Sequence, residues 1–211
     1  MLANLMYAAV LLAGPKWSDP ESEKMEEVSG DALRRAFSGS KEWIEQNNST
    51  VEEIERDIDR RAPLLHDLYK LETAIKTVLG ESELDTTKLG ALLRDEEAVL
   101  ATALAKSPAD LMVLNFKGHW HKNRAILYLE SKRDDKKDEE LIDSERTFKA
   151  VIARAPEDPS ALNGLGSVSI LRGDLDGGEK YILKALSIAP HYQEAQHDLK
   201  LIKQLRDKSL K

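Results

Sequence analysis

The chain has 211 residues, of which 41% are apolar, 33% charged and 5% aromatic, and it contains no cysteine. Few aromatic residues and much Ala, Leu, Glu, Lys and Arg disfavour a β-sheet protein, and the absence of cysteine excludes disulfides and thiolate chemistry. The 38 acidic side chains outnumber the 31 basic ones, and the net charge of −7 argues against nucleic acid as the main ligand.

Residues 1–14 carry no charge and are largely apolar. The stretch is shorter than a bilayer-spanning helix and lacks the basic start of a secretory signal. We therefore expect a packed first helix in a cytoplasmic protein. A membrane anchor on a membrane-associated or periplasmic protein stays open as the alternative.

Helical patterns fill the region up to Gly80. They predict short helices at 20–37 and 41–46, and overlapping Ser/Thr-x-x-Glu capping boxes then begin another helix. We expect that helix to end at Pro63, because proline lacks a backbone N–H. Leucine and isoleucine at three-to-four spacing over 64–79 predict a separate amphipathic helix that ends at Gly80.

Helical periodicity then continues to the C-terminus without a competing strand pattern. The charged run 132–140 mixes both signs, which indicates a solvated helix extension or loop. The remaining predicted helices, the first capped by Thr86 or Thr87, cover 88–106, 109–131, 141–154, 160–171, 177–188 and 192–208.

A helix end rich in small residues and followed by proline recurs along the chain. The prolines at 15, 63, 108, 156 and 190 are separated by 48, 45, 48 and 34 residues. A recurring terminator implies a recurring helical unit, and stacked helical units form a binding surface.

The last unit carries several residue types at fixed offsets, namely Leu162, Leu165, Gly166, Gly173, Ile182, Ala185 and Pro190. On these positions the segment 159–192 resembles a tetratricopeptide repeat, although Ser169 and Gly178 stand where that family prefers tyrosine and alanine. The segment 111–158 is similar but contains an insertion. Residues 66–110 and 18–65 are weaker copies.

The resemblance implies an all-α protein, an α-solenoid of antiparallel helical hairpins with the superhelical form of that family. Its parts would be a helical region at 1–110 with elongated hairpins, repeats at 111–158 and 159–192, and a capping helix at 193–211.

The chain offers little sign of catalysis or of a cofactor. His119 and His121 are two residues apart, which on a helix turns them about 200° from each other, so they cannot share a metal ion. No pair of carboxylates and no Ser/His/Asp order stands out. We expect a protein that is not an enzyme and holds no metal or cofactor.

The resemblance implies a groove lined by the first helix of each hairpin, which binds a peptide or helix of a partner protein. The corresponding positions are Met112, Asn115, His119, Lys122, Asn163, Ser167, Ile170, Glu194, His197 and Leu201. Asn115 and Asn163 are the strongest candidates, because an asparagine amide can hold a peptide backbone through its donor and its acceptor. Acidic Glu194 and Asp198 argue against the chaperone-tail clamp of this family.

The leading hypothesis is a non-catalytic scaffold for protein interaction. A membrane-tethered or periplasmic assembly factor anchored through residues 1–14, and a regulatory subunit of a larger enzyme complex, stay open as alternatives. The sequence does not indicate the oligomeric state.

Overall fold

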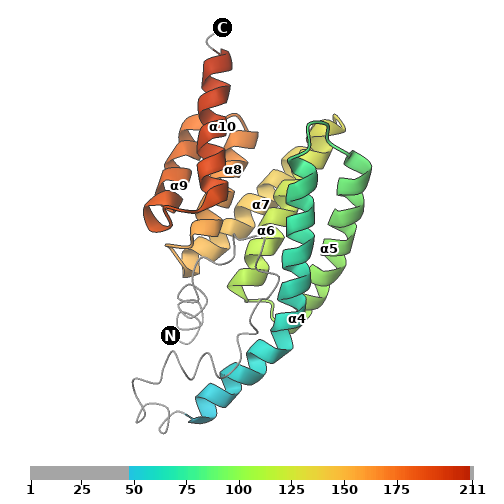
Figure 1. Cartoon of the computed structure of the whole chain (residues 1–211), viewed down its shortest axis with the longest axis vertical. Helices are drawn as coiled ribbons and strands as arrows, with labels where there is room; N and C mark the ends of the chain where they lie inside the picture. Colours follow the sequence, from blue (N-terminus) through green and yellow to red (C-terminus); the bar gives the residue numbers. More distant parts are fainter. Residues whose placement is uncertain (1–47, 210–211) are drawn as a thin grey trace. The chain divides into compact units, whose positions relative to one another are not determined.

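The computed structural model describes residues 48–209, and their side chains from 63 to 208. This part of the chain is all-α, with seven helices and no strand (Figure 1). The helices are α4 (Asn48–Leu79), α5 (Thr86–Lys106), α6 (Leu111–Glu130), α7 (Asp134–Arg154), α8 (Pro159–Leu171), α9 (Leu175–Ile188) and α10 (Gln193–Ser209). Residues from Leu64 onward belong to one unit, and the packing below concerns this unit alone. The helices predicted at 1–14, 20–37 and 41–46 lie outside the described residues.

The prediction that a helix ends at Pro63 is wrong, because α4 continues through this proline. A proline inside a helix removes one backbone hydrogen bond and crowds the preceding turn. Good helix formers surround it, with Arg-Arg-Ala before it and Leu-Leu after it. The two helices predicted at 49–63 and 64–79 are therefore one helix.

Two other helix starts differ from the prediction. The cap of α5 is Asp85, whose side chain accepts a hydrogen bond from the backbone N–H of Lys88, rather than Thr86 or Thr87. The helix predicted from 141 begins earlier, at Asp134, so the charged run 132–140 is mostly the helix extension of the two alternatives, with two aspartates in the first turn of α7. Acidic groups there interact favourably with the positive end of the helix dipole.

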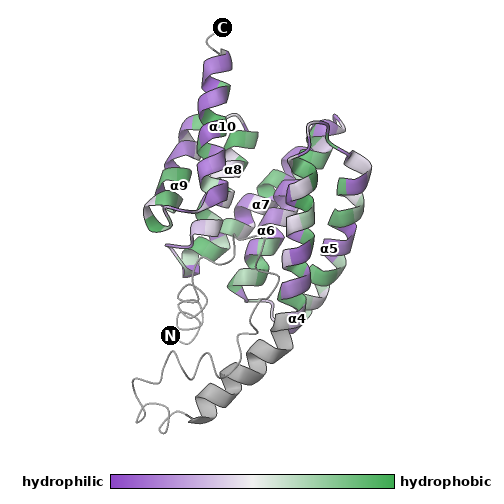
Figure 2. Cartoon of the chain, in the orientation of Figure 1, coloured by the Kyte–Doolittle hydropathy of each residue, from purple (hydrophilic) through white to green (hydrophobic). Residues whose placement is uncertain are grey.

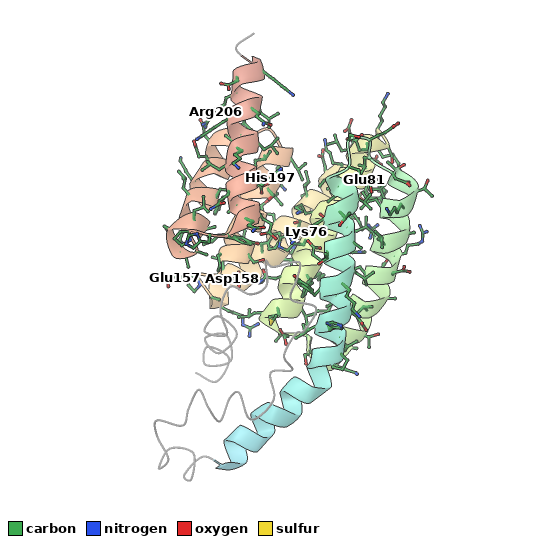
Figure 3. All side chains as sticks on the ribbon, viewed as in Figure 1. Lys76, Glu81, Glu157, Asp158, His197 and Arg206 are labelled. Carbon is green, nitrogen blue, oxygen red and sulfur yellow. The ribbon has the colours of Figure 1, made fainter. Side chains whose placement is uncertain are left out.

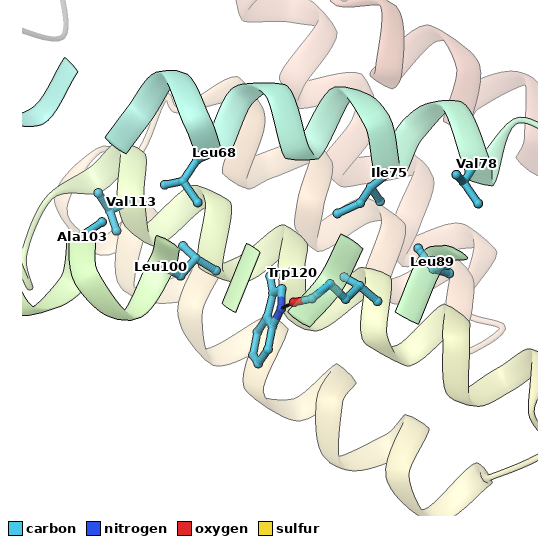
Figure 4. Packing of buried hydrophobic residues seen from close by; sticks show 9 residues of the cluster. Leu68, Ile75, Val78, Leu89, Leu100, Ala103, Val113 and Trp120 are labelled. Atoms are coloured by element: carbon cyan, nitrogen blue, oxygen red, sulfur yellow. Dashed lines mark hydrogen bonds between the residues drawn. The ribbon is translucent and has the colours of Figure 1, made fainter. Parts of the chain in front are cut away.

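The first half of the unit is held by an apolar core between α4, α5 and α6. Leu68, Ile75, Leu89 and Leu100 are almost fully buried in it, and Trp120 packs beside them (Figure 4). The indole N–H of Trp120 donates to the carbonyl oxygen of Leu93 at 2.8 Å, so this buried donor is satisfied.

The pairs α6–α7 and α8–α9 share one internal pattern. In each pair a glycine of the first helix faces a large side chain of the second, Gly118 under Phe148 and Gly166 under Ile182. A Cβ atom on either glycine would come within 2.6 Å of that side chain. The absence of a side chain therefore sets how closely the paired helices approach.

The helices of the two pairs also begin and end in the same way. An aspartate caps each first helix, Asp110 for α6 and Asp158 for α8, and accepts backbone N–H groups of the first turn. The alanines Ala155 and Ala189 end the second helices, each followed by a proline. The unit therefore contains the same helix-pair pattern twice.

The helices of the unit carry both hydrophobic and hydrophilic residues (Figure 2), and most residues from Ala161 to Val168 of α8 are buried. None of the helices in the described residues combines the length and the apolar character that crossing a bilayer requires.

Candidate functional site

Polar side chains from four helices meet between the helices of the unit, and some of them reach solvent. Spacing of three or four residues places the contributions of α6 on one face. We call this set the polar cluster, and it consists of Glu72, Lys76, Asn115, His119, Lys122, Asn123, Asp158, Ser160, Tyr192 and Glu194. Figure 3 labels one member on α4, Lys76, and one at the start of α8, Asp158.

The bond between Asn115 and Asp158 joins the two helix pairs. The Asn115 amide donates to one carboxylate oxygen of Asp158 at 3.0 Å, and the other oxygen accepts the backbone N–H of Ala161 at 2.8 Å. Asp158 thus caps α8 and anchors α6 with one side chain. Asn115 is 9% exposed, and this hydrogen bond commits its amide N–H to the contact between the pairs, while its Oδ1 has no partner in the described chain.

The two histidines next to Trp120 have separate surroundings. His119 Nε2 lies 3.1 Å from the hydroxyl of Ser160 on α8, and its ring packs edge-on against Phe148. His121 Nδ1 lies 2.7 Å from the carboxylate of Glu140 on α7. The two rings therefore contact different helices.

Burial and nearby ammonium groups keep His119 neutral. Burial lowers the pKa of His119 well below its ordinary value, and the charges of Lys122 and Lys76 lower it further. Its neighbour Tyr192 faces Ser160, and burial together with Glu194 raises the pKa of the Tyr192 hydroxyl above its ordinary value. These two aromatic groups are thus uncharged at neutral pH.

An ion pair connects the end of α4 to the start of α10. Lys76 Nζ lies 2.6 Å from a carboxylate oxygen of Glu194 and 3.8 Å from one of Glu72. Although burial opposes it, these carboxylates raise the pKa of Lys76. The side chains of Lys76 and Glu194 are 45% and 39% exposed. The pair therefore lies at the solvent side of the polar cluster.

A buried carboxyl group of α5 lies near the cluster. Glu96 is fully buried, and neither of its oxygens forms a hydrogen bond within the described chain. Burial raises the pKa of Glu96 to about 9, and the charge of Glu72 adds to this, while Lys122 opposes it. Glu96 is therefore protonated at neutral pH.

Asn163 occupies in the second helix pair the position that Asn115 occupies in the first. Each follows the aspartate that caps its helix by five positions, Asp110 before Asn115 and Asp158 before Asn163. Asn115 donates to the cap of the next helix pair, but Tyr192 stands before α10 where that pattern would have an aspartate. Asn163 is 3% exposed, and its side-chain oxygen Oδ1 has no hydrogen-bond partner within the described chain, which is also true of Asn115 Oδ1.

Beside Asn163, α8 is tied to α10. The hydroxyl of Ser167, one turn further along α8, donates to a carboxylate oxygen of Asp198 at 2.6 Å. His197 is exposed, with Nδ1 3.5 Å from Asp198. The amide of Asn163 thus lies on the face of α8 that α10 approaches.

The structure brings part of the predicted groove together. Asn115, His119, Lys122 and Glu194 belong to the polar cluster, and Ser167 and His197 meet at Asp198. Ile170 packs against the core around Ile182. The partly buried Met112 and Leu201 complete the predicted set.

Sequence reasoning missed the carboxylates of α4 and α5. Glu72 and Glu96 stand at core spacing, between Leu68 and Ile75 and between Leu93 and Leu100. A charged residue inside an apolar helix face is the signal that would have identified them.

No group of three or more histidine or carboxylate side chains within 63–208 is placed to hold a metal ion. The chain matches no family model, no curated protein and no solved structure. Its function has to be inferred from the geometry of the unit.

Proposed function

We propose that this chain is a repeat protein of the tetratricopeptide type, an α-solenoid that binds a segment of a partner protein. In this interpretation α6–α7 and α8–α9 are successive hairpins, and α10 is the capping helix. The support is the pattern shared by the two pairs: an aspartate cap, an asparagine five positions later, and a glycine facing the large residue of the second helix. Repeats of this kind act through the surface that they build together.

The observation that carries the proposal is the buried amide of Asn163. A buried polar atom without a hydrogen bond destabilises the chain by about 1–3 kcal/mol. A ligand that supplies the missing hydrogen bond therefore binds more tightly. A peptide backbone offers a donor and an acceptor to the same amide. Asn163 is therefore the contact that we assign to the partner, whereas the Asn115 amide N–H already donates to Asp158 and only its Oδ1 is unpaired.

The role that we propose is non-catalytic. Two hydroxyl groups of α8 are engaged with side chains of other helices, in the Ser167–Asp198 and Ser160–His119 contacts. Such a site holds a ligand in place through shape and hydrogen bonds.

Selection of short random peptides on the immobilised full chain tests this proposal. Isothermal titration of the selected peptides against Asn163→Ala should show a loss of affinity of about tenfold or more, as expected when a buried hydrogen bond to the ligand is removed. Ser187→Ala is the matched control, because Ser187 is exposed on α9 and bonds only to its own helix at Lys184. Failure to select any peptide, or equal affinity for Asn163→Ala, would overturn the proposal.

A further inference from the structure

The end of α4 covers the solvent side of the polar cluster next to the proposed binding surface. Lys76 reaches from α4 to Glu194 in the first turn of α10, across 118 residues of sequence. Its charge also acts on His119, which lies buried in the cluster. Figure 3 shows Lys76 on α4 and His197 on α10.

We propose that the Lys76–Glu194 ion pair is a latch, and that the partner segment carries a lysine or arginine that replaces Lys76 at Glu194 and Glu72. The inference rests on the proposed function and specifies the chemistry of the partner. It makes Lys76 an internal substitute for a basic side chain of the partner.

The charges around the latch favour a partner segment with a positive charge. Carboxylates outnumber ammonium groups around the latch, and this excess grows when Lys76 moves away. The groups concerned are Glu72, Asp158 and Glu194 against Lys76 and Lys122. A guanidinium group can bind two carboxylates through its planar set of donors. An acidic partner would face the same carboxylates at a cost.

The Lys76–Glu194 ion pair can be replaced by an ion pair with the partner at little cost to stability. Both of its side chains are partly exposed, and an ion pair of that kind contributes little to stability, so opening it costs the fold little. Glu72 is only 6% exposed as a side chain and hydrogen-bonds at 3.4 Å to the Asn123 amide. One carboxylate of the receiving pair is therefore buried and bonded to Asn123, whereas the other is 39% exposed.

The test is selection of random short peptides on the immobilised full chain, as wild type and as Lys76→Met. Both selected pools should be enriched in lysine and arginine relative to the unselected library. Individual peptides should bind Lys76→Met about fivefold more tightly than wild type, because they no longer compete with an internal cation. Glu194→Gln should weaken the same peptides about tenfold or more.

The matched control is Lys203→Met. Lys203 follows Glu194 by nine residues, which places it on the opposite side of α10, and it is exposed. It should leave the affinity unchanged. Thermal unfolding of each variant verifies that it is folded.

The outcomes separate the two proposals. Peptides that depend on Asn163 but show no enrichment in basic residues, or that bind Lys76→Met no more tightly than wild type, overturn the latch alone. Absence of any Asn163-dependent peptide overturns the proposed function instead.

Discussion

Asn115 and Asn163 show how one residue type at equivalent positions acquires different roles. Both are buried, but only Asn115 has an aspartate within reach, at 3.0 Å. The difference lies in the residue that precedes the next helix, aspartate before α8 and tyrosine before α10. Whether a buried asparagine belongs to the packing or to a ligand therefore depends on a residue about thirty to forty positions away.

This contrast predicts opposite effects on stability. Asn115→Ala should lower the free energy of unfolding by about 1–3 kcal/mol, since it leaves a carboxylate oxygen of Asp158 without that donor. Asn163→Ala breaks no hydrogen bond of the described chain and adds helix propensity, so stability should stay equal or rise. Urea unfolding of both variants measures the difference. A loss for Asn163→Ala as large as that for Asn115→Ala would contradict the assignment.

The raised pKa of Glu96 predicts that the free energy of unfolding falls as pH rises. Its pKa is about 9 in the folded chain against an ordinary 4.5, so the folded state binds the proton more tightly between these values. Folding stability should therefore decline from pH 4.5 towards 9, by about 1.4 kcal/mol per pH unit at most. Glu96→Gln keeps a neutral side chain and should remove that slope. Urea unfolding of wild type and variant across this pH window is the measurement, and parallel curves would contradict the prediction.

At the scale of elements, local sequence signals located most helices. The predicted helices at 109–131, 160–171 and 177–188 agree with α6, α8 and α9 within two residues at each end, because caps and apolar spacing are local. The prediction failed at Pro63, where a strong local breaker lies inside a helix. At the charged run 132–140 the prediction had left open a helix extension or a loop, and α7, which begins at Asp134, agrees with the helix extension.

The contacts within the polar cluster could be predicted from the sequence less well than the helices. Its contacts join residues more than forty positions apart, such as Asn115 with Asp158 and Lys76 with Glu194. The resemblance to a repeat family identified Asn115, His119 and Glu194 as facing one region, but it could not show which of them pair with each other. Only the packing of the helices decides that.

The approach of α8 to α9 depends on Gly166. Gly166→Ala should destabilise the chain by about 1–3 kcal/mol, because its Cβ would lie 2.6 Å from Ile182 Cγ1 and 3.1 Å from the carbonyl oxygen of Gly178. Gly90→Ala is the control, since its Cβ would meet only ordinary contacts at 3.7 Å and alanine is the better helix former. It should stabilise by about 0.5–1 kcal/mol. Thermal unfolding compares the two, and equal shifts would refute this account of helix spacing.

At the scale of the whole chain, charge and repeat pattern favour one kind of function. The net charge of −7 suits a basic partner, and two helix pairs of the same pattern suit a surface assembled from successive units. The first helices of the pairs, together with α10, would carry that surface, while α7 and α9 support it from behind. This arrangement is the central claim of the proposed function.

Amide hydrogen exchange of the full chain with and without a selected peptide tests that claim most directly. Binding on the proposed surface should slow exchange in α8 and α10, with the largest effect around Asn163 and Glu194, and leave α9 and the second half of α7 unchanged. Protection confined to α7 and α9, or no protection at a saturating peptide concentration, would contradict it.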